Sequence, residues 1–243
     1  MLQPYLTKIQ QLLMKIEKEE SENLLLNAKK IANALKNKKL VHVFGCGHSH
    51  MLAEEVFYRS GGLAPINPIF IEDLMLHKGA SQSSQYEKKQ GFAETFLQTL
   101  SIEKGDILIV ASTSGRNPVP IDVALYGKEK GAIVIGITSL YYSNSQSSKH
   151  SSGLHLSDVV DSVINNHIEV GDALISFDEE NIQVGSGSSI AGMTIMNGLM
   201  VEAIQILINN GIQPPVFKSG NVDGSEAHNA KLIKEYQSRI PIL

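Results

Sequence analysis

The sequence predicts an α/β fold in which helices cover both faces of a parallel β-sheet. Beyond Lys39, apolar runs of strand length alternate with segments of helical periodicity, the pattern typical of such a sheet. Most of these runs are continuously apolar, as a strand buried on both faces requires. Two of them also end in loops rich in glycine and hydroxyl side chains, and a helical pattern follows each loop. These observations predict the fold class and indicate where a ligand binds.

The first 38 residues predict a helical extension ahead of the sheet. Apolar side chains between Tyr5 and Asn37 recur at helical spacing, which indicates one or two amphipathic helices. The charged segment at 17–20 is either a solvated face or a break between two helices. Packing on the chain's own sheet and formation of a dimer are equally consistent with this pattern. We therefore divide the chain into this extension, residues 1–38, and one domain, residues 39–243, that ends in a polar tail.

Five strands and four helices are expected in the domain. The strands are Leu40–Phe44, Pro68–Glu72, Ile107–Ala111, Ala132–Thr138 and Val159–Asn165. The helices are Ser49–Ser60, Gln85–Thr99, Val119–Lys130 and Ser188–Asn210. Asn117 is the expected N-cap of the third helix, with Pro118 at its first position. Residues 139–158 are expected to form a long polar loop, and the polar tail at 219–229 ends in a short helical segment.

Composition narrows the classes of partner and compartment. The net charge is −4 and the lysines and arginines are scattered, so no basic stripe is present for a nucleic-acid backbone. The only cysteine, Cys46, excludes an internal disulfide, and the N-terminus lacks the regions of a signal peptide. We expect that no apolar stretch approaches the length of a membrane span. The sequence thus predicts a cytoplasmic protein that binds neither nucleic acid nor membrane.

The two loops at the strand ends share one chemistry. The first, at 45–49, follows the strand Leu40–Phe44, and the second, at 112–117, follows Ile107–Ala111. Free backbone N–H groups and the positive end of a helix dipole converge at such a place and attract anions. Glycine lets the backbone approach an oxyanion, and hydroxyls add neutral donors. The alternative is ordinary turn and capping chemistry, but two such loops favour a phosphorylated or carboxylated ligand.

Three motifs carry a resemblance to a known family. Ser112-Thr113-Ser114-Gly115-Arg116-Asn117-Pro118, paired with Gly45-Cys46-Gly47-His48-Ser49, resembles the sugar isomerase (SIS) phosphosugar-binding domain. Gly185-Ser186-Gly187-Ser188-Ser189 and the residues after it resemble the serine-rich entry to the last helix of N-acetylmuramic acid 6-phosphate etherases. The tail motifs at 220–223 and 229–232 are similar to the tail of the same etherases. The whole sequence is similar to an uncharacterised SIS branch often labelled phosphoheptose isomerase.

The resemblance implies a three-layer αβα sandwich with a five-stranded parallel sheet. It also implies a homodimer or homotetramer with sites where subunits meet. The phosphate of a sugar phosphate would lie among Ser49, Ser112, Ser114 and Asn117, and Ser188 and Ser189 would close the sugar side. The full set of expected ligand-binding residues is Gly45, Gly47, His48, Ser49, Ser112, Thr113, Ser114, Asn117, Ser188 and Ser189.

The implied activity is aldose–ketose isomerisation or ether cleavage of a sugar phosphate. Both reactions need a base that takes a proton next to a carbonyl and an acid that protonates an oxygen. The alternative is a non-catalytic phosphosugar sensor or regulatory subunit, since SIS domains also regulate. Fewer than about 40 residues precede the first strand, too few for a DNA-binding module.

The family's catalytic positions match this chain only in part. Phosphoheptose isomerases carry a histidine and, one turn later, an acid/base glutamate on the first-loop helix, and an ungapped match places Glu55 and Arg59 there. The etherase glutamate is also met by Arg59. A family zinc site at these positions would lack its ligands, so neither a metal nor another cofactor is expected. Glu55 and Arg59 also have the spacing of a helix ion pair.

The candidate acid/base residues are therefore Glu87, Glu55 and His228. By rough alignment, Glu87 lies where the etherases have a functional glutamate, although a lone helical glutamate is more often solvated. His228 resembles tail residues that SIS enzymes swing over the sugar, and its alternative is a surface histidine. Glu72 and Asp73, which follow the second expected strand, could act in the site or cap a helix.

The remaining candidates lie in the first loop. His48 is expected to donate to the ligand, and His50 to pack or face solvent, because no cysteine or carboxylate lies at a metal-ligand spacing. Cys46 is expected to be a small buried spacer, because no adjacent base would activate its thiol.

Overall fold

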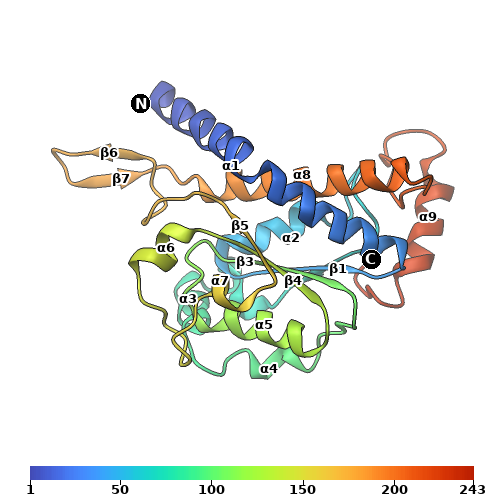
Figure 1. Ribbon diagram of the computed structural model, residues 1–243, viewed down its shortest axis with the longest axis horizontal. Coiled ribbons are helices and arrows are strands. Elements are labelled where there is room, and N and C mark those ends of the chain that lie inside the picture. Colours follow the sequence, from blue (N-terminus) through green and yellow to red (C-terminus); the bar gives the residue numbers. More distant parts are fainter.

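The computed structural model describes residues 1–243 and confirms the predicted fold class. A single sheet of five parallel strands, in the order β2-β1-β3-β4-β5, lies between two layers of helices (Figure 1). The strands are β1 (Val41–Gly45), β2 (Ile66–Ile69), β3 (Ile107–Ala111), β4 (Ile133–Thr138) and β5 (Ser162–Asn165).

Side chains of each central strand alternate between two cores. In β3, Ile107 and Ile109 join the core beneath α1 (Leu2–Lys36), α2 (Met51–Val56) and α8 (Ser188–Asn209). Leu108 and Val110 join the core beneath α3 (Ala80–Glu87), α4 (Glu94–Leu97), α5 (Pro118–Glu129) and α7 (Leu156–Val159). Since successive side chains of a strand face opposite sides, burial on both faces produces the continuous apolar runs of the sequence.

The N-terminal extension is one continuous helix of 35 residues that packs along α8. Its charged segment does not break it, because Glu20 turns inward and is buried. The Glu20 carboxylate lies 3.2 Å from Nε2 of His167 and accepts a hydrogen bond from Nδ2 of Asn23 at 2.9 Å. Ile16 and Ile31 of the same helix belong to the core over the sheet.

Four expected elements have wrong boundaries. The fifth strand is Ser162–Asn165 and not Val159–Asn165, because Val159 ends α7. The second strand is Ile66–Ile69 and not Pro68–Glu72, and Glu72 instead begins the 3-10 turn η2 (Glu72–Leu74). The first helix starts as the 3-10 turn η1 (Gly47–His50) and ends at Val56. The expected helix Gln85–Thr99 is two helices, α3 and α4, because the intervening Gly91 has a φ of +70° that no helix continues.

The segment at 139–158 is not one long loop. The Ser139 hydroxyl caps α6 (Leu140–Ser145) by accepting from the Tyr141 N–H, and buried Leu156 and Val159 hold the short helix α7. A second short turn, η3 (Leu76–Lys78), follows η2. An unexpected antiparallel hairpin of β6 (Ile175–Phe177) and β7 (Ile182–Val184) projects from one end of the molecule (Figure 1).

The C-terminal tail closes the opposite end. Helix α9 (Ser225–Tyr236) includes the short helical segment expected in the tail and packs through Leu232 on Ala64 and Phe217. Beyond it, Arg239 donates to the buried carboxylate of Asp106 at 2.8 Å. Together with the hydrogen bond between His42 and Asp106, this ties the chain's last residues to the start of the sheet.

Helix α8 contradicts the expectation that no apolar stretch approaches the length of a membrane span. It has 22 residues and an 18-residue window of mean hydropathy 1.5, so its length and composition would suffice to cross a membrane. In the structure, Ile195, Met196 and Leu199 are buried in the core, and 44% of that window is buried. Core helices of soluble proteins pass the same test, so the finding is weak support for a membrane span.

Candidate functional site

The two loops predicted to bind an anion meet at one edge of the sheet. Strands β1 and β3 are neighbours and parallel, with Gly45 paired with Ala111 at their carboxyl ends. The loop after β1 and the loop after β3 therefore leave the sheet side by side. Ligands of open α/β folds bind at this edge.

The first loop depends on glycine for its close approach to the strand. A Cβ on Gly45 would lie 2.5 Å from the carbonyl carbon of Ser49, so only glycine lets the chain turn back so tightly. Gly47 has a φ of +54°, which glycine adopts without strain. The turn places Ser49 and His48 at the cavities described below. His50 faces away, bonded through Nδ1 to the carbonyl oxygen of Gly47, and Cys46 is buried.

The second loop presents hydrogen-bond donors. The Ser112 hydroxyl oxygen accepts from the Gly115 N–H at 3.2 Å, which leaves the hydroxyl hydrogen for a ligand. The backbone N–H groups of Thr113 and Ser114 donate to no acceptor within the chain. Gly115 has a φ of +59°, and a Cβ there would lie 2.5 Å from Oγ1 of Thr138. The loop can therefore donate at least three hydrogen bonds to an anion.

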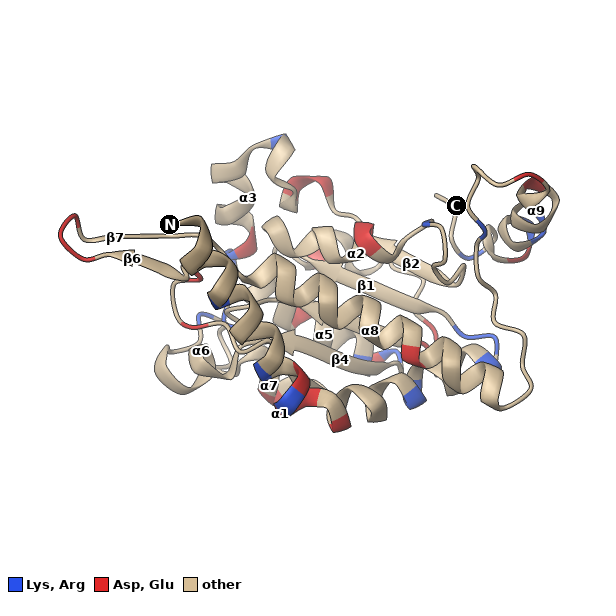
Figure 2. Ribbon diagram, turned by 90° about the horizontal axis from the view of Figure 1, so that it is seen from above, with Lys and Arg blue, Asp and Glu red and all other residues tan.

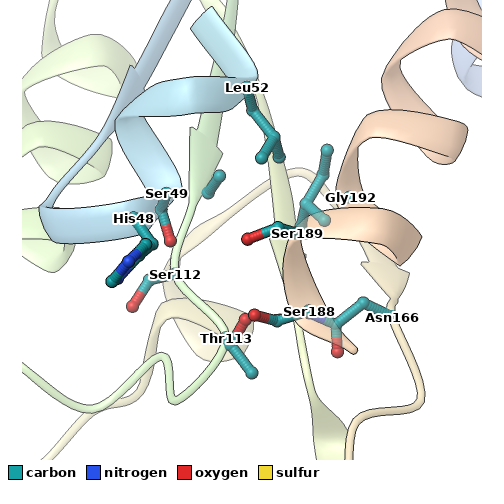
Figure 3. Close-up of a pocket in the computed structure, with 11 residues that line it drawn as sticks. His48, Ser49, Leu52, Ser112, Thr113, Asn166, Ser188, Ser189 and Gly192 are labelled. Carbon is teal, nitrogen blue, oxygen red and sulfur yellow. The ribbon is translucent and has the colours of Figure 1, made fainter. Parts of the chain in front are cut away.

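Two cavities adjoin these loops. The larger, of about 330 Å³, lies between the loops and α3. It is lined by Cys46, Gly47, His48, Ser49, Leu76, Ser83, Ser84, Glu87, Lys88, Ser112, Thr113, Ser114 and Asn117. The smaller, of about 10 Å³, lies toward α8, with Ser49, Ser112 and Ser189 directed into it (Figure 3). A volume of about 10 Å³ holds one water-sized group, so a small-molecule ligand fits only the larger cavity.

Glu87, which is half-buried, and Asn117, which is buried, form a hydrogen-bonded pair in the larger cavity. Nδ2 of Asn117 donates to the Glu87 carboxylate at 2.8 Å, so the Asn117 side chain does not cap α5 as expected. The carbonyl oxygen of the Asn117 side chain is buried and has no donor within the chain. Burial raises the pKa of Glu87 above its ordinary value, against the opposing effects of Asn117 and of Lys88 and Lys149. A carboxyl with a raised pKa thus lies beside a buried, unpaired acceptor.

Burial also affects the only thiol. It raises the pKa of Cys46 well above its ordinary value, and the charge of Glu87 adds to this effect. A thiol held in the protonated form is a poor nucleophile, so this cysteine acts as a small buried spacer.

The α8 side of the site has the opposite hydrogen-bonding character. Asp172 accepts from the N–H groups of Gly187 at 2.9 Å and Ser188 at 3.0 Å, and from the Ser188 hydroxyl at 2.6 Å. The chain's own carboxylate therefore occupies the N-terminus of α8, where a ligand anion could otherwise bind. Because the Ser188 hydrogen is committed, Ser188 offers a ligand only its lone pairs.

Three predicted site residues, namely Gly45, Glu55 and His228, lie outside both cavities. Glu55 forms an ion pair with Arg59 and accepts from Nδ2 of Asn197 at 2.8 Å. His228 lies on α9 and lines a separate cavity beyond the C-terminal end of α8, where its Nε2 is 2.9 Å from the carbonyl oxygen of Val216. Within one chain, Glu87 is the one acid/base candidate that the fold brings to the loops. Glu72 pairs with Lys78 at 2.9 Å and lines neither cavity.

Sequence reasoning missed several lining residues. Ser83 and Ser84 precede Glu87 by four and three residues on α3, and this spacing could have shown that they share its face; Lys88, just after α3, also lines the cavity. Asn166 lines the smaller cavity and donates to Oγ1 of Thr113 at 3.2 Å, but no local pattern marks it. No group of three or more His, Cys, Asp or Glu side chains is arranged to hold a metal ion.

The comparisons with known proteins identify the family and the fold. Residues 4–139 match the sequence model of the SIS domain. A UPF0309 protein from Halalkalibacterium halodurans is 51% identical over 243 residues, which cover 100% of this chain and 97% of that protein. A UPF0309 protein from Listeria monocytogenes serotype 4b is 48% identical, over 100% of this chain and 98% of its own length.

Two solved structures share the fold. Phosphoheptose isomerase GmhA from Neisseria gonorrhoeae superposes with a TM-score of 0.55 at 15% identity, over 84% of this chain and 97% of that chain. A phosphoheptose isomerase from Francisella tularensis gives a TM-score of 0.53 at 17% identity, over 84% and 96%. At these identities the likeness concerns the fold alone.

Proposed function

The chain belongs to the SIS domain family, and on this premise we propose that it binds a sugar phosphate and interconverts its aldose and ketose forms. The observation that carries the proposal is the larger cavity. It joins two donor-rich loops to the half-buried carboxyl of Glu87 within about 330 Å³, a volume within the range of small-molecule sites. The two phosphoheptose isomerases share this fold, which agrees with the proposal.

In this proposal the two loops hold the phosphate. Ser112, Thr113 and Ser114 offer hydroxyl and backbone donors, and Ser49 adds a hydroxyl from the first loop. Lys88, directly after α3, contributes a positive charge at the cavity wall. Neutral donors supplemented by one cation favour a dianionic phosphate over an uncharged sugar, because hydrogen bonds to a charged acceptor are the stronger kind.

Glu87 is the proposed acid/base residue. Its carboxylate takes the proton from the carbon next to the carbonyl, and its carboxylic acid returns that proton to the former carbonyl carbon. Between these two steps the hydroxyl proton on the first carbon passes to the former carbonyl oxygen, so that the enediol becomes the isomer. Burial raises the pKa of Glu87 toward neutral pH, and a carboxyl with such a pKa both accepts and returns a proton there. Asn117 orients Glu87 through its Nδ2, and Asn117 itself lines the same cavity. Asn117 is thus proposed as a positioning and ligand-binding residue.

The roles of Glu55 and His228, the oligomeric state and the compartment are further proposals. Glu55 and His228 lie away from the cavity in a single chain, so a role for either in the reaction needs a neighbouring subunit. We place the protein in the cytoplasm as a homodimer or homotetramer that uses no nucleic acid, membrane or cofactor. Ether cleavage would use the same base, and a sensor would use the same loops without turnover.

A hydrogen-exchange experiment tests the proposed reaction. A thermal-shift screen of pentose, hexose and heptose phosphates and of N-acetylmuramic acid 6-phosphate first identifies ligands, because a ligand of the folded state raises the melting temperature. Each ligand is then incubated with the protein in D₂O and followed by proton NMR. Isomerisation through Glu87 predicts deuterium at the carbon next to the carbonyl and formation of the isomer, with neither in Glu87→Gln. Binding without exchange would support the sensor, and release of a lactyl group would support the etherase.

A further inference from the structure

The β6–β7 hairpin exposes an apolar face that its own chain leaves uncovered. Ile175 pairs with Val184 and Phe177 with Ile182, so these four side chains share one face of the hairpin. Only Ile175, at its base, is buried; Phe177, Ile182 and Val184 are 36%, 50% and 42% exposed. A two-stranded hairpin alone is marginally stable in water, so this face requires a partner.

The tip of the same hairpin is acidic. Asp178, Glu179 and Glu180 connect the two strands, and all three are exposed. The hairpin therefore combines an apolar face with three negative charges at its end, as Figure 2 shows at the left of the molecule. A surface that fits it must be apolar and bordered by positive charge.

The opposite end of the molecule has such a surface. A cavity of about 300 Å³ lies where the ends of α1 and α8 meet α9 (Figure 1). Its floor is apolar, with Leu35, Leu207, Ile212, Pro214, Pro215, Leu232 and Tyr236. Lys36, Lys38 and Lys231 border it and are exposed, with Glu235 as the only carboxylate among the lining residues. The ion-paired lysines of the chain are others, namely Lys39, Lys78 and Lys128.

Helix α8 connects the two surfaces. It starts three residues after the hairpin, and Leu207 near its end lines the lysine-bordered cavity. Its outer side exposes Ile190, Val201 and Ile208, and Gly198 between them has no atom within 4 Å of the Cβ position. A two-fold axis across α8 would place the hairpin of each copy against the cavity of the other, so the same contact would form twice.

We propose that the protein dimerises with α8 packed against α8, and that each hairpin docks its apolar face and acidic tip on the lysine-bordered cavity of a second copy. This inference rests on the homo-oligomer of the proposed function and assigns its contact surface. The dimer would also hold Ser188 and Ser189 in position, because only residues 185–187 separate these two residues from the docked hairpin.

Charge reversal tests the contact. One variant carries Asp178→Lys, Glu179→Lys and Glu180→Lys, and the other carries Lys36→Glu, Lys38→Glu and Lys231→Glu. Each places like charges together in its own dimer, so sedimentation velocity should show at least a tenfold weaker dimer than the parent. Mixed in equal amounts, the two should form a heterodimer, because both of its hairpin contacts again join opposite charges.

The control variant makes the same lysine-to-glutamate change at Lys89, Lys104 and Lys130, on the α3–α5 side of the sheet, and should sediment as the parent does. Circular dichroism and melting temperature establish that each variant folds. A dimeric parent whose two charge variants also remain dimeric, or fail to associate on mixing, overturns this surface but not the homo-oligomer. A parent that is monomeric at about 100 μM, a concentration at which dimers with a Kd in the micromolar range form, overturns both.

Discussion

The hydroxyls of Ser112 and Ser188, near the two cavities, make different hydrogen bonds within the chain. These bonds determine what each hydroxyl offers a ligand. Ser112 accepts a backbone hydrogen bond and keeps its own hydrogen free, whereas Ser188 gives its hydrogen to Asp172. The loop after β3 therefore donates, and the start of α8 accepts. An anion is favoured at the first and a sugar hydroxyl at the second.

Replacing the donors of the second loop should weaken phosphate binding. In the variant Ser112→Ala/Ser114→Ala, the affinity for a sugar phosphate should fall by about 1–3 kcal/mol, since each lost donor leaves a charged acceptor less well bound. Titration calorimetry measures the change. The matched control is Ser147→Ala/Ser151→Ala, which alters two exposed hydroxyls away from the cavities. Equal affinity of the Ser112/Ser114 variant and the parent would remove these residues from the site.

Glu87→Gln should separate activity from stability. Turnover should fall by roughly 10²–10⁴-fold, as for a lost general acid/base. Because the pKa of Glu87 is raised on folding, the folded protein holds this proton more tightly than the unfolded chain. Ionisation therefore destabilises the fold as pH rises above about 4.5, the ordinary value for glutamate.

The variant should accordingly melt at a higher temperature than the parent at pH 7, and the difference should shrink at pH 4. Differential scanning calorimetry at both pH values measures it, with Glu94→Gln on the exposed side of α4 as control. A lower melting temperature for Glu87→Gln at pH 7 would contradict the account of its burial.

Among the elements, strands buried on both faces were predicted more accurately than the edge strand β2. Strands β1 and β3 were predicted to within a residue because burial on both faces leaves an uninterrupted apolar run. Strand β2 was displaced because it is the edge strand, where Pro68 is tolerated and the apolar pattern is weaker. The hairpin was missed because its strands have three residues each.

For the site, the sequence predicted those features that lie within one contiguous segment of the chain. Both loops could be proposed from local motifs, since glycine, hydroxyl and helix signals are contiguous, whereas Glu87 was proposed from the resemblance to the etherases. The pairing of Glu87 with Asn117 and the bonding of Asp172 to α8 join residues 30 and 15 or 16 positions apart. Such contacts depend on how the elements pack, which a single sequence does not specify.

Asp172 should be important for the start of α8. In Asp172→Ala, two backbone donors and the Ser188 hydroxyl lose their acceptor, so stability should fall by about 0.5–2 kcal/mol, the range for a lost N-cap. Urea unfolding measures this. Glu179→Ala, at the exposed hairpin tip, should leave stability within about 0.5 kcal/mol of the parent. An Asp172→Ala protein as stable as the parent would show that the cap contributes nothing.

At the end of the sheet opposite the site, one buried carboxylate connects three distant parts of the chain. The buried carboxylate of Asp106 joins β1, β3 and the C-terminal tail through His42, the Leu40 N–H and Arg239. Burial alone would raise the pKa of Asp106, but the hydrogen bonds from His42, Arg239, Leu40 and Glu103 lower it well below its ordinary value. A depressed pKa stabilises the fold above the ordinary value, about 3.8, and this contribution is lost as pH falls toward the folded pKa.

Asp106→Asn should therefore destabilise the protein most at neutral pH. Removing one partner of a buried charged pair costs about 3–5 kcal/mol, and the loss at pH 7 should approach that range. The difference from the parent should narrow below pH 4, because the Asp106 carboxyl binds a proton there in the unfolded parent but not in the folded one. Guanidinium unfolding at pH 7 and pH 3 checks both values. A difference that does not depend on pH would contradict a role for the ionised carboxylate.

The central claim is that the cavity recognises the phosphate of a sugar. Titration calorimetry of the parent protein with a sugar phosphate from the thermal-shift screen, and with the same sugar lacking phosphate, tests it most directly. Several charge-assisted hydrogen bonds, each worth about 1.5–3 kcal/mol, predict at least a hundredfold preference for the phosphorylated sugar. Equal affinity for the two sugars would contradict the claim.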